Sequence, residues 1–212
     1  MTPRVPGHSV VATVPDDQPL VALTVDDGVS SEVVRAYVQL AAATGIRLTF
    51  FANGVYSSWA DNREVMQPLV DSGQIVIGNH TWDHPDVTTI SRSGLVDQLT
   101  RNDKALSNLY GASTKPFFRP PYMAHNDATD QVAVDQGYPI ICWWTGSFGD
   151  STQITADQVL TNARQYLRAG TIVIGHANFP PVTTVFDDII GLLKERSLQT
   201  VTLADVYRAS SP

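Results

Sequence analysis

The chain alternates between short apolar runs and longer segments in which apolar residues recur every three or four positions. The short runs predict buried strands, and the longer segments predict helices with one apolar face. The first strand is expected at 20–25. The first helix is expected from about residue 31 to residue 43, because Ser30 or Ser31 can cap its start and Gly45 can end it.

The same alternation continues to the C-terminus. Further strands are predicted at 47–51, 74–77, 116–119, 139–144, 171–174 and 199–203, and further helices at 61–70, 95–109, 127–136, 155–168 and 185–196. About seven strand-then-helix units predict an α/β protein with a parallel sheet, either open or closed into a barrel. In such folds the active site gathers at the carboxyl ends of the strands.

Length and composition fit a single domain. The 212 residues, of which 43% are hydrophobic, suffice for one substantial core and not comfortably for two. Four prolines within residues 1–19 predict a lead-in segment without a regular core. The domain itself is therefore expected to span 20–212.

Charge and apolar content narrow the set of partners. A net charge of −7 makes nucleic acid and anionic membrane surfaces unfavourable partners. No apolar run approaches the roughly 20 residues of a membrane-spanning helix, and residues 1–30 lack the apolar centre of a signal peptide. The protein is expected either to stay in the cytoplasm or to begin here after a removed signal or anchor. Cys142, the only cysteine, lies in an apolar run and is expected to be a buried structural thiol.

Two strand ends carry residues typical of a metal site. His80 and His84 follow one strand, and their spacing places both imidazoles on one face if the segment turns helically. Asp26 and Asp27 end another strand, where neighbouring side chains point to opposite sides, so one can bind metal while the other takes a proton from water. Two imidazoles and a carboxylate leave coordination positions open. Each pattern alone is also typical of a polar loop; their coincidence predicts the site.

Two further strand ends carry groups suited to hydrolysis. The fork of Arg119 can hold a carboxylate, and the backbone N–H of Tyr122, beyond two stiffening prolines, can stabilise an oxyanion. His176 can protonate a leaving amine. The alternatives are a rigid loop with a surface arginine and a hydrogen-bonded core histidine.

Four motifs, in this order, carry a resemblance to a known family. They are Thr24-Val25-Asp26-Asp27-Gly28, His80-Thr81-Trp82-Asp83-His84-Pro85, Arg119-Pro120-Pro121-Tyr122 and Ile174-Gly175-His176. Together they resemble the polysaccharide deacetylases of carbohydrate esterase family four, the NodB-homology domain, over roughly residues 20–208. The resemblance implies a distorted (β/α) barrel of about seven strands and a divalent metal, usually zinc, although cobalt or nickel can serve.

The resemblance also implies roles for individual residues. The implied metal ligands are Asp27, His80 and His84. The implied catalytic residues are Asp26 as general base, Arg119 as the group that orients it, the Tyr122 N–H as oxyanion donor and His176 as general acid. Ile174 is implied to line the pocket for the acetyl methyl group.

The chain departs from the family pattern at several positions. Val25 stands where phenylalanine is usual, and Met123 stands where glycine is usual, which is expected to narrow the mouth of the site. The fourth motif is degraded, and its nearest alignment is the segment 147–151. There Asp150 is expected to orient and charge His176, while Ser151 replaces a tryptophan of the acyl pocket.

Aromatic side chains suit a sugar ligand because rings stack on the apolar faces of pyranoses. Those in or beside the predicted strand-end loops are Trp82, Tyr122, Trp143, Trp144 and Phe179. Trp82 is the preferred platform because it lies between the two histidines, and Trp143 is expected in the core.

The sequence therefore predicts a metal-dependent deacetylase acting on an acetylated glycan. Peptidoglycan or chitin-type N-acetylglucosamine is preferred, and acetylxylan is the second choice. The rival hypotheses are an amidase acting on a small non-sugar amide and a non-catalytic glycan-binding protein on the same scaffold. A wall polymer as substrate would place the protein outside the cytoplasm or in the cell envelope. The sequence leaves the oligomeric state open.

Overall fold

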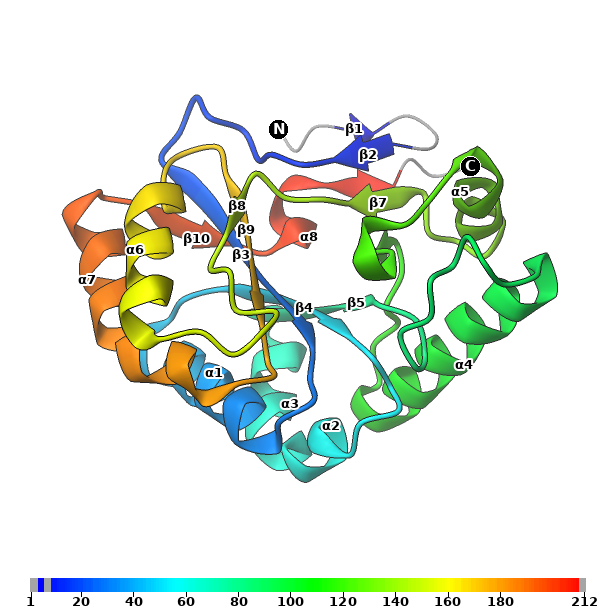
Figure 1. Cartoon of the computed structure of the whole chain (residues 1–212), viewed down its shortest axis with the longest axis horizontal. Helices are drawn as coiled ribbons and strands as arrows, with labels where there is room; N and C mark the ends of the chain where they lie inside the picture. The colour runs from blue at the N-terminus through cyan, green and yellow to red at the C-terminus, as the bar shows by residue number, and fades with distance from the viewer. Residues whose placement is uncertain (1–3, 6–8, 210–212) are drawn as a thin grey trace.

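The fold is a curled parallel sheet wrapped by helices, as the computed structural model in Figure 1 shows. The model describes residues 4–5 and 9–209. The main sheet contains β2 (Ser9–Val11), β3 (Leu20–Asp27), β4 (Leu48–Ala52), β5 (Ile75–Asn79), β6 (Phe117–Phe118), β7 (Ile140–Cys142), β8 (Gly146–Ser147), β9 (Ile172–His176) and β10 (Gln199–Val201). The short strands β1 (Arg4–Val5) and β11 (Arg208–Ala209) pair separately.

The strand order is β2-β7-β6-β5-β4-β3-β9-β8, with β10 paired to the start of β3. Every pairing between these strands is parallel. Within the described residues β2 and β8 stand at the two ends of this order, and an isolated antiparallel bridge between Thr13 and Thr171 joins the segment after β2 to the start of β9. The predicted distorted α/β barrel is confirmed in this form.

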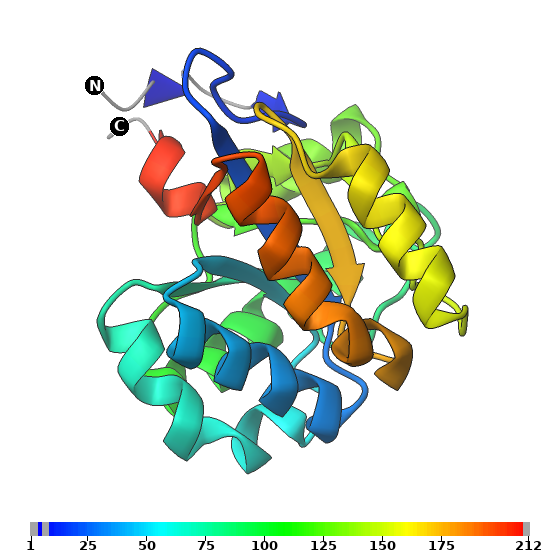
Figure 2. The ribbon, with the colours of Figure 1, turned by 90° about the vertical axis from the view of Figure 1, so that its left-hand side faces the viewer.

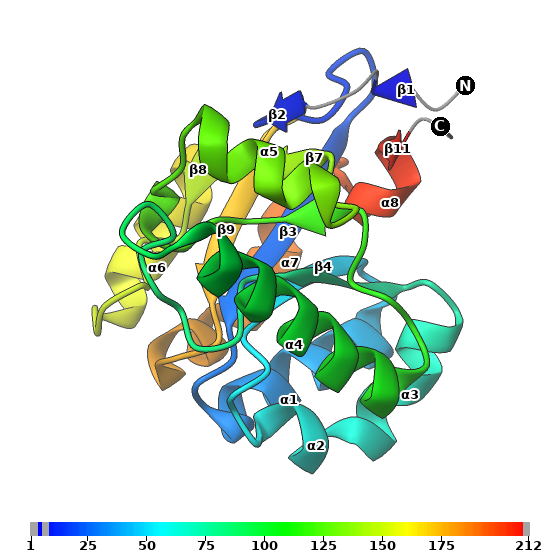
Figure 3. The ribbon, with the colours of Figure 1, turned by 90° about the vertical axis from the view of Figure 1, so that its right-hand side faces the viewer.

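Helices cover the outer faces of the sheet. They are α1 (Ser31–Thr44), α2 (Ser58–Asp61), α3 (Arg63–Asp71), α4 (Arg92–Tyr110), α5 (Asp127–Asp135), α6 (Ala156–Tyr166), α7 (Phe186–Glu195) and α8 (Leu203–Val206), with 3₁₀ turns η1 (Pro121–Met123) and η2 (Pro180–Val185). Helices α6 and α7 pack side by side on one flank (Figure 2), and α4 and α5 pack together on the other (Figure 3).

The strands are buried on both faces, as their near-continuous apolar sequences predict. In β4, Phe50 belongs to the cluster beneath the helices, while its neighbour Phe51 belongs to a second cluster with Cys142. Cys142 is fully buried, and burial raises the pKa of its thiol to about 12. This is the environment expected of a structural thiol.

Two local features differ from the sequence prediction. The predicted helix 61–70 appears as α3 and begins only at Arg63, because a separate short helix, α2, precedes it and the buried side chain of Asn62 bonds the carbonyls of Ser31 and Ser58 at the junction. The lead-in segment also contributes to the sheet, since β2 pairs with β7 and both Val11 and Val14 are buried.

Candidate metal centre and active site

The carboxyl ends of four strands bring the predicted site residues together. Asp27 ends β3, His80 follows β5, Arg119 follows β6, and His176 ends β9. Because β6, β5, β4, β3 and β9 are successive parallel neighbours, their carboxyl ends meet at one edge of the sheet. The fold therefore converts four separate sequence motifs into one cluster.

Asp27, His80 and His84 form a compact set of ligand atoms. One such atom from each residue lies within 4.8 Å of the others. Asp27 Oδ1 lies 3.3 Å from His80 Nε2 and 3.4 Å from His84 Nε2. Two imidazole nitrogens and one carboxylate oxygen make a donor set that suits zinc and similar divalent metals.

The hydrogen bonds around this set leave His80 Nε2 and Asp27 Oδ1 available to bind a metal. His80 Nδ1 lies 2.6 Å from the Arg119 carbonyl, which only accepts, so Nδ1 carries the hydrogen and Nε2 keeps its lone pair. Asp27 Oδ2 accepts from Asn178 at 2.6 Å. Asp27 Oδ1 is buried without a hydrogen-bond partner among the described residues. A buried carboxylate oxygen left without a donor and facing two imidazoles fits a divalent cation.

The local electrostatics favour the ligand forms of these side chains. Burial alone would raise the pKa of Asp27, but the interactions with His80, His176 and Asn178 together hold that pKa far below its usual range. Burial is the main cause that lowers the pKa of His84, because a charged imidazole loses its hydration there. Metal binding requires an ionised carboxylate and neutral imidazoles, so both shifts favour it.

Asp26 is held by a buried arginine. Arg119 Nη1 donates to Asp26 Oδ1 at 2.6 Å, and the two side chains are only 1% and 3% exposed. The same guanidinium donates to Thr24 Oγ1 at 2.9 Å and to the Cys142 carbonyl at 3.1 Å. Removing one partner from a buried pair of this kind typically costs ~3–5 kcal/mol. The Oδ2 atom of Asp26 faces the metal ligands, 3.7 Å from His80 Nε2.

Aromatic rings hold the guanidinium of Arg119. Its Cζ lies 4.1 Å from the ring centroid of Phe51 and 5.3 Å from that of Trp144. A planar cation stacked on aromatic faces keeps a fixed orientation. The position of the Asp26 carboxylate is fixed in turn.

His176 is paired with Asp150, as the alignment of the degraded fourth motif predicts. Asp150 accepts from the His176 backbone N–H at 3.1 Å, and its other oxygen lies 3.0 Å from His176 Nδ1. Burial alone would lower the pKa of His176, but the hydrogen bond to Asp150 and the charge of Asp26 raise it overall. The imidazolium form is therefore favoured, with Nε2 free of this pairing.

Backbone strain concentrates at the site. Among the described residues, six non-glycine residues have a positive φ, and all except Ser197 lie at or after the carboxyl ends of β3, β5 and β6. These five are Asp27, Thr81, His84, Tyr122 and Met123. Such conformations cost about 1–3 kcal/mol each and persist only where the surroundings impose them. The ring of Tyr122 lies edge-on to His84, with 4.5 Å between centroids.

Buried asparagine side chains hydrogen-bond the backbone of the loop that contains His80 and Thr81. Asn53 donates to the carbonyls of both His80 and Thr81, and Asn79 Oδ1 accepts from the Thr81 N–H at 2.9 Å. Asn102 donates to Asn79 Oδ1 at 2.9 Å. All three asparagines are fully buried. They satisfy backbone groups that the left-handed turn at Thr81 would otherwise leave unpaired.

A cavity of about 340 Å³ opens beside these groups. Trp144, Ser147, Ser151 and Ile174 contribute to its wall, together with the metal-ligand set, Asp26 and His176. Met123 also lines the cavity and is 36% exposed. Ile174 and Ser151, which the family resemblance assigns to the acyl pocket, both line this cavity.

Trp82 lies outside this cavity, unlike Trp144. The guanidinium of Arg101 is 4.1 Å from the Trp82 ring centroid and covers one of its faces. Trp82, the sugar platform preferred from the sequence, is half-buried and its ring lies beside Gly54.

Asn178 is a residue of the site that the sequence motifs did not single out. Its side-chain Nδ2 donates to Asp27 Oδ2, and its side-chain Oδ1 accepts from the Val29 N–H at 3.4 Å. The available signal was its place two residues beyond His176, on the same strand-end loop.

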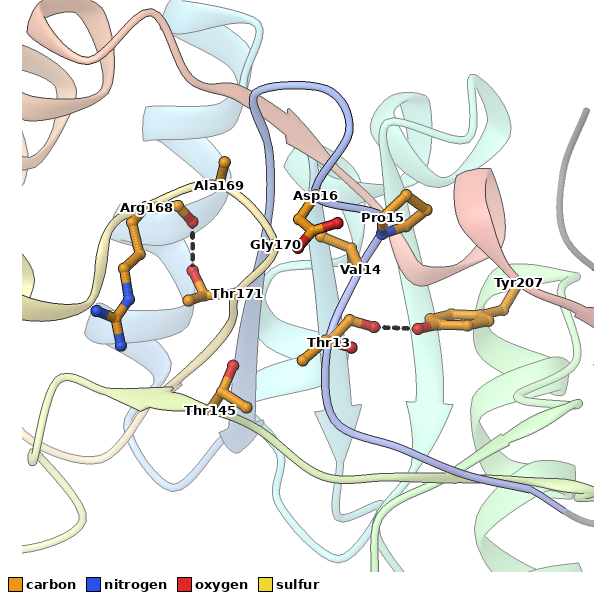
Figure 4. Close-up of a pocket in the computed structure, with 10 residues that line it drawn as sticks. All are labelled: Thr13, Val14, Pro15, Asp16, Thr145, Arg168, Ala169, Gly170, Thr171 and Tyr207. Atoms are coloured by element: carbon orange, nitrogen blue, oxygen red, sulfur yellow. Dashed lines mark hydrogen bonds between the residues drawn. The ribbon is translucent and has the colours of Figure 1, made fainter.

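A larger cavity, of about 500 Å³, lies at the amino end of β8 and β9 (Figure 4). Thr13, Asp16, Arg168 and Tyr207 contribute to its wall, and the Tyr207 hydroxyl bonds the Thr13 carbonyl. Among the described residues it contains none of the metal-binding cluster. The smaller cavity is therefore the candidate active site, because the convergent polar groups lie there.

Comparison with known proteins agrees with this assignment. The polysaccharide deacetylase family model matches residues 13–141. The peptidoglycan-N-acetylglucosamine deacetylase PgdA of Listeria monocytogenes is 30% identical over 190 residues, which are 88% of this chain and 38% of that protein. The chain thus spans well under half the length of that relative.

Solved structures share the fold. The Bc1960 peptidoglycan N-acetylglucosamine deacetylase matches with a TM-score of 0.84 at 24% identity, over 96% of this chain and 94% of that one. A pseudoenzyme of carbohydrate esterase family four from Bacillus anthracis matches with a TM-score of 0.81 at 21% identity, over 95% and 70%. The fold is therefore common to enzymes and pseudoenzymes. Because the family model matches more than half of this chain, the chain belongs to the polysaccharide deacetylase family.

Proposed function

We propose that the protein is a metal-dependent deacetylase that hydrolyses N-acetyl groups of an N-acetylglucosamine polymer of the peptidoglycan or chitin type. The observation that carries the proposal is the unpartnered, buried Asp27 Oδ1 between two imidazoles, beside an arginine-held Asp26 and an Asp150-paired His176. The name and substrate of the Listeria relative support the substrate class.

The metal would be held by Asp27, His80 and His84, with zinc preferred and cobalt or nickel as alternatives. When bound, such a cation acts as a Lewis acid that polarises a carbonyl and makes water more acidic. The first catalytic task of the protein itself is proton removal. Arg119 occupies Asp26 Oδ1, so Oδ2 is the oxygen left to accept a proton from the attacking water.

The remaining steps use groups on the other strand ends. Water forms a bond to the acyl carbon, and the Tyr122 N–H is assigned to stabilise the negative oxygen that develops. The carbon–nitrogen bond then breaks, and His176 gives its proton to the departing amine, which leaves acetate as the second product. Asp150 keeps His176 oriented and charged for this transfer. Ile174 offers an apolar wall to the acetyl methyl group.

A wall polymer as substrate implies work at the cell envelope or outside the cell. Within the described residues, none of the helices is long and apolar enough to cross a membrane. Fractionation of cells that produce the native protein tests this part of the proposal, and recovery only from the cytosol would contradict it.

Acetate release tests the activity. The protein is supplied with zinc, cobalt or chelator and given N-acetylglucosamine oligomers, peptidoglycan fragments, acetylxylan and small non-sugar amides. We expect metal-dependent release from the first two. Release from small amides alone would favour an amidase, and glycan binding without any release would favour a pseudoenzyme.

A further inference from the structure

One histidine–carboxylate pair lies apart from the groups described so far. His125 Nδ1 lies 2.9 Å and 2.8 Å from the two carboxylate oxygens of Asp130, which accept its hydrogen. The two side chains are 17% and 4% exposed. The pair joins the loop that follows η1 to helix α5. Neither residue has a part in the catalytic steps proposed above.

His125 also contacts the segment that follows β7. Its ring lies edge-on to the ring of Trp143, with 5.5 Å between the centroids. The backbone carbonyl of Trp143 accepts from Arg119 Nη2 at 3.3 Å, and the next residue, Trp144, lines the candidate active site. His125 is therefore held between α5 and a segment that reaches the site.

The turn that precedes His125 forms part of the wall of the same cavity. Pro120, Tyr122 and Met123 all line it. The ring of Tyr122 also lies against His84, one of the candidate metal ligands. The position of this turn therefore sets where the Tyr122 N–H, the proposed oxyanion donor, lies relative to the metal-ligand set.

Two successive residues of this turn have left-handed backbone conformations. The φ angles are 56° at Tyr122 and 58° at Met123. A residue with a Cβ atom keeps this conformation only where its surroundings impose it. The Ala124 N–H closes the turn by donating to the Pro121 carbonyl at 3.0 Å. That bond lies within the turn, whereas the contacts of His125 connect the turn to the rest of the protein.

The side chain at position 123 makes such a connection important. Glycine, which is usual here in the family that the chain resembles, adopts left-handed conformations without steric cost. Met123 has no such freedom, so its φ of 58° must be maintained by contacts elsewhere. His125 is only two residues further along the chain and is fixed on two sides.

We propose that His125 is a positioning residue that holds the strained turn 121–123 against the cavity, through Asp130 on one side and Trp143 on the other. It acts through the backbone of Tyr122. This inference rests on the proposed function for the role of the Tyr122 N–H, and it adds a residue that does not itself line the cavity.

The kinetics of H125A test the positioning role. A displaced oxyanion donor weakens binding of the transition state only, so kcat for N-acetylglucosamine oligomers should fall about tenfold while KM changes less than about twofold. In an M123G background the same substitution should lower kcat less than about threefold relative to M123G alone, because glycine keeps the turn without strain. Equal losses in both backgrounds would mean that His125 does not act through this turn.

R92A is the matched control, because Arg92 also forms an ion pair with helix α5. Its Nη2 lies 2.6 Å from Asp135 Oδ2, and both side chains are exposed. R92A should change kcat less than about twofold, and thermal melting should show all the variants folded. A loss of kcat in R92A as large as that in H125A would overturn the proposal, because any disturbance of α5 would then have the same effect.

Amide hydrogen exchange separates this inference from the proposed function. With zinc added, the Ala124 N–H should exchange about tenfold faster in H125A than in the wild type, as measured by NMR of isotope-labelled protein. That result supports the anchoring of the turn even if no acetate is released from any substrate. An unchanged exchange rate overturns it even if the deacetylase activity is established. Faster exchange with an unchanged kcat would likewise overturn the positioning role.

Discussion

The two ends of the parallel strands each carry a cavity, and the two cavities differ in what surrounds them. The one at the amino ends is larger and is lined by loop residues such as Thr13 and Arg168 (Figure 4). The one at the carboxyl ends is smaller but contains buried carboxylates, paired histidines and most of the strained backbone. Size therefore does not identify the site. The site is identified by polar groups that converge in one place although backbone strain and desolvation oppose that arrangement.

The largest expected effect is a loss of activity when Asp26, at the carboxyl-end cavity, is replaced. We expect D26N to lower kcat by about 10²–10⁴, because an amide cannot take the proton from water. Metal content, measured by elemental analysis, should stay at the wild-type level because Asp27, His80 and His84 remain. Loss of metal in this variant would contradict the assignment of Asp26 as the base.

A smaller effect is expected from Asn178, which holds the second oxygen of Asp27. We expect N178A to weaken metal affinity by about 10–100-fold, as is typical when a hydrogen-bond partner of a ligand is removed. Competition with a fluorescent zinc chelator measures this directly. T145A, at the amino-end cavity, is the control. Equal affinities in N178A and T145A would show that Asn178 does not support the ligand.

The dependence of kcat on pH tests the role of His176 at the carboxyl-end cavity. The hydrogen bond to Asp150 and the charge of Asp26 raise the pKa of His176, so the proposed acid keeps its proton to higher pH. D150N removes a group that favours the imidazolium, so the pKa should fall. We expect the alkaline limb of kcat against pH to move to lower pH. An unmoved limb would mean that another group supplies the proton.

The smallest effect is expected at the amino-end cavity. Arg168 is exposed there and touches none of the catalytic groups described above. R168A should change kcat/KM by less than about twofold, because surface substitutions away from special features have small effects. A tenfold loss on a glycan substrate would mean that the larger cavity takes part in substrate binding.

Much of the fold could be predicted from local patterns. The apolar runs and caps gave the main strands and helices, for example α1, whose Ser30 cap and Gly45 end are both present. The division at Asn62 and the strand β2 were missed. Each depends on partners distant in the chain, Ser31 for Asn62 and β7 for β2.

The candidate site divides in the same way. The sequence by itself determined which chemical groups stand at the strand ends, since each motif lies within a few residues and parallel strands place their carboxyl ends together. The pairing of Asp150 with His176 was expected from the fourth-motif alignment. Only the tertiary structure decided that Asn178 reaches Asp27 across 151 residues and that Trp144 rather than Trp82 lines the cavity. The physical reason is that short-range spacing fixes the type of group, whereas its neighbours depend on side-chain directions and loop conformations set by packing over the whole sheet.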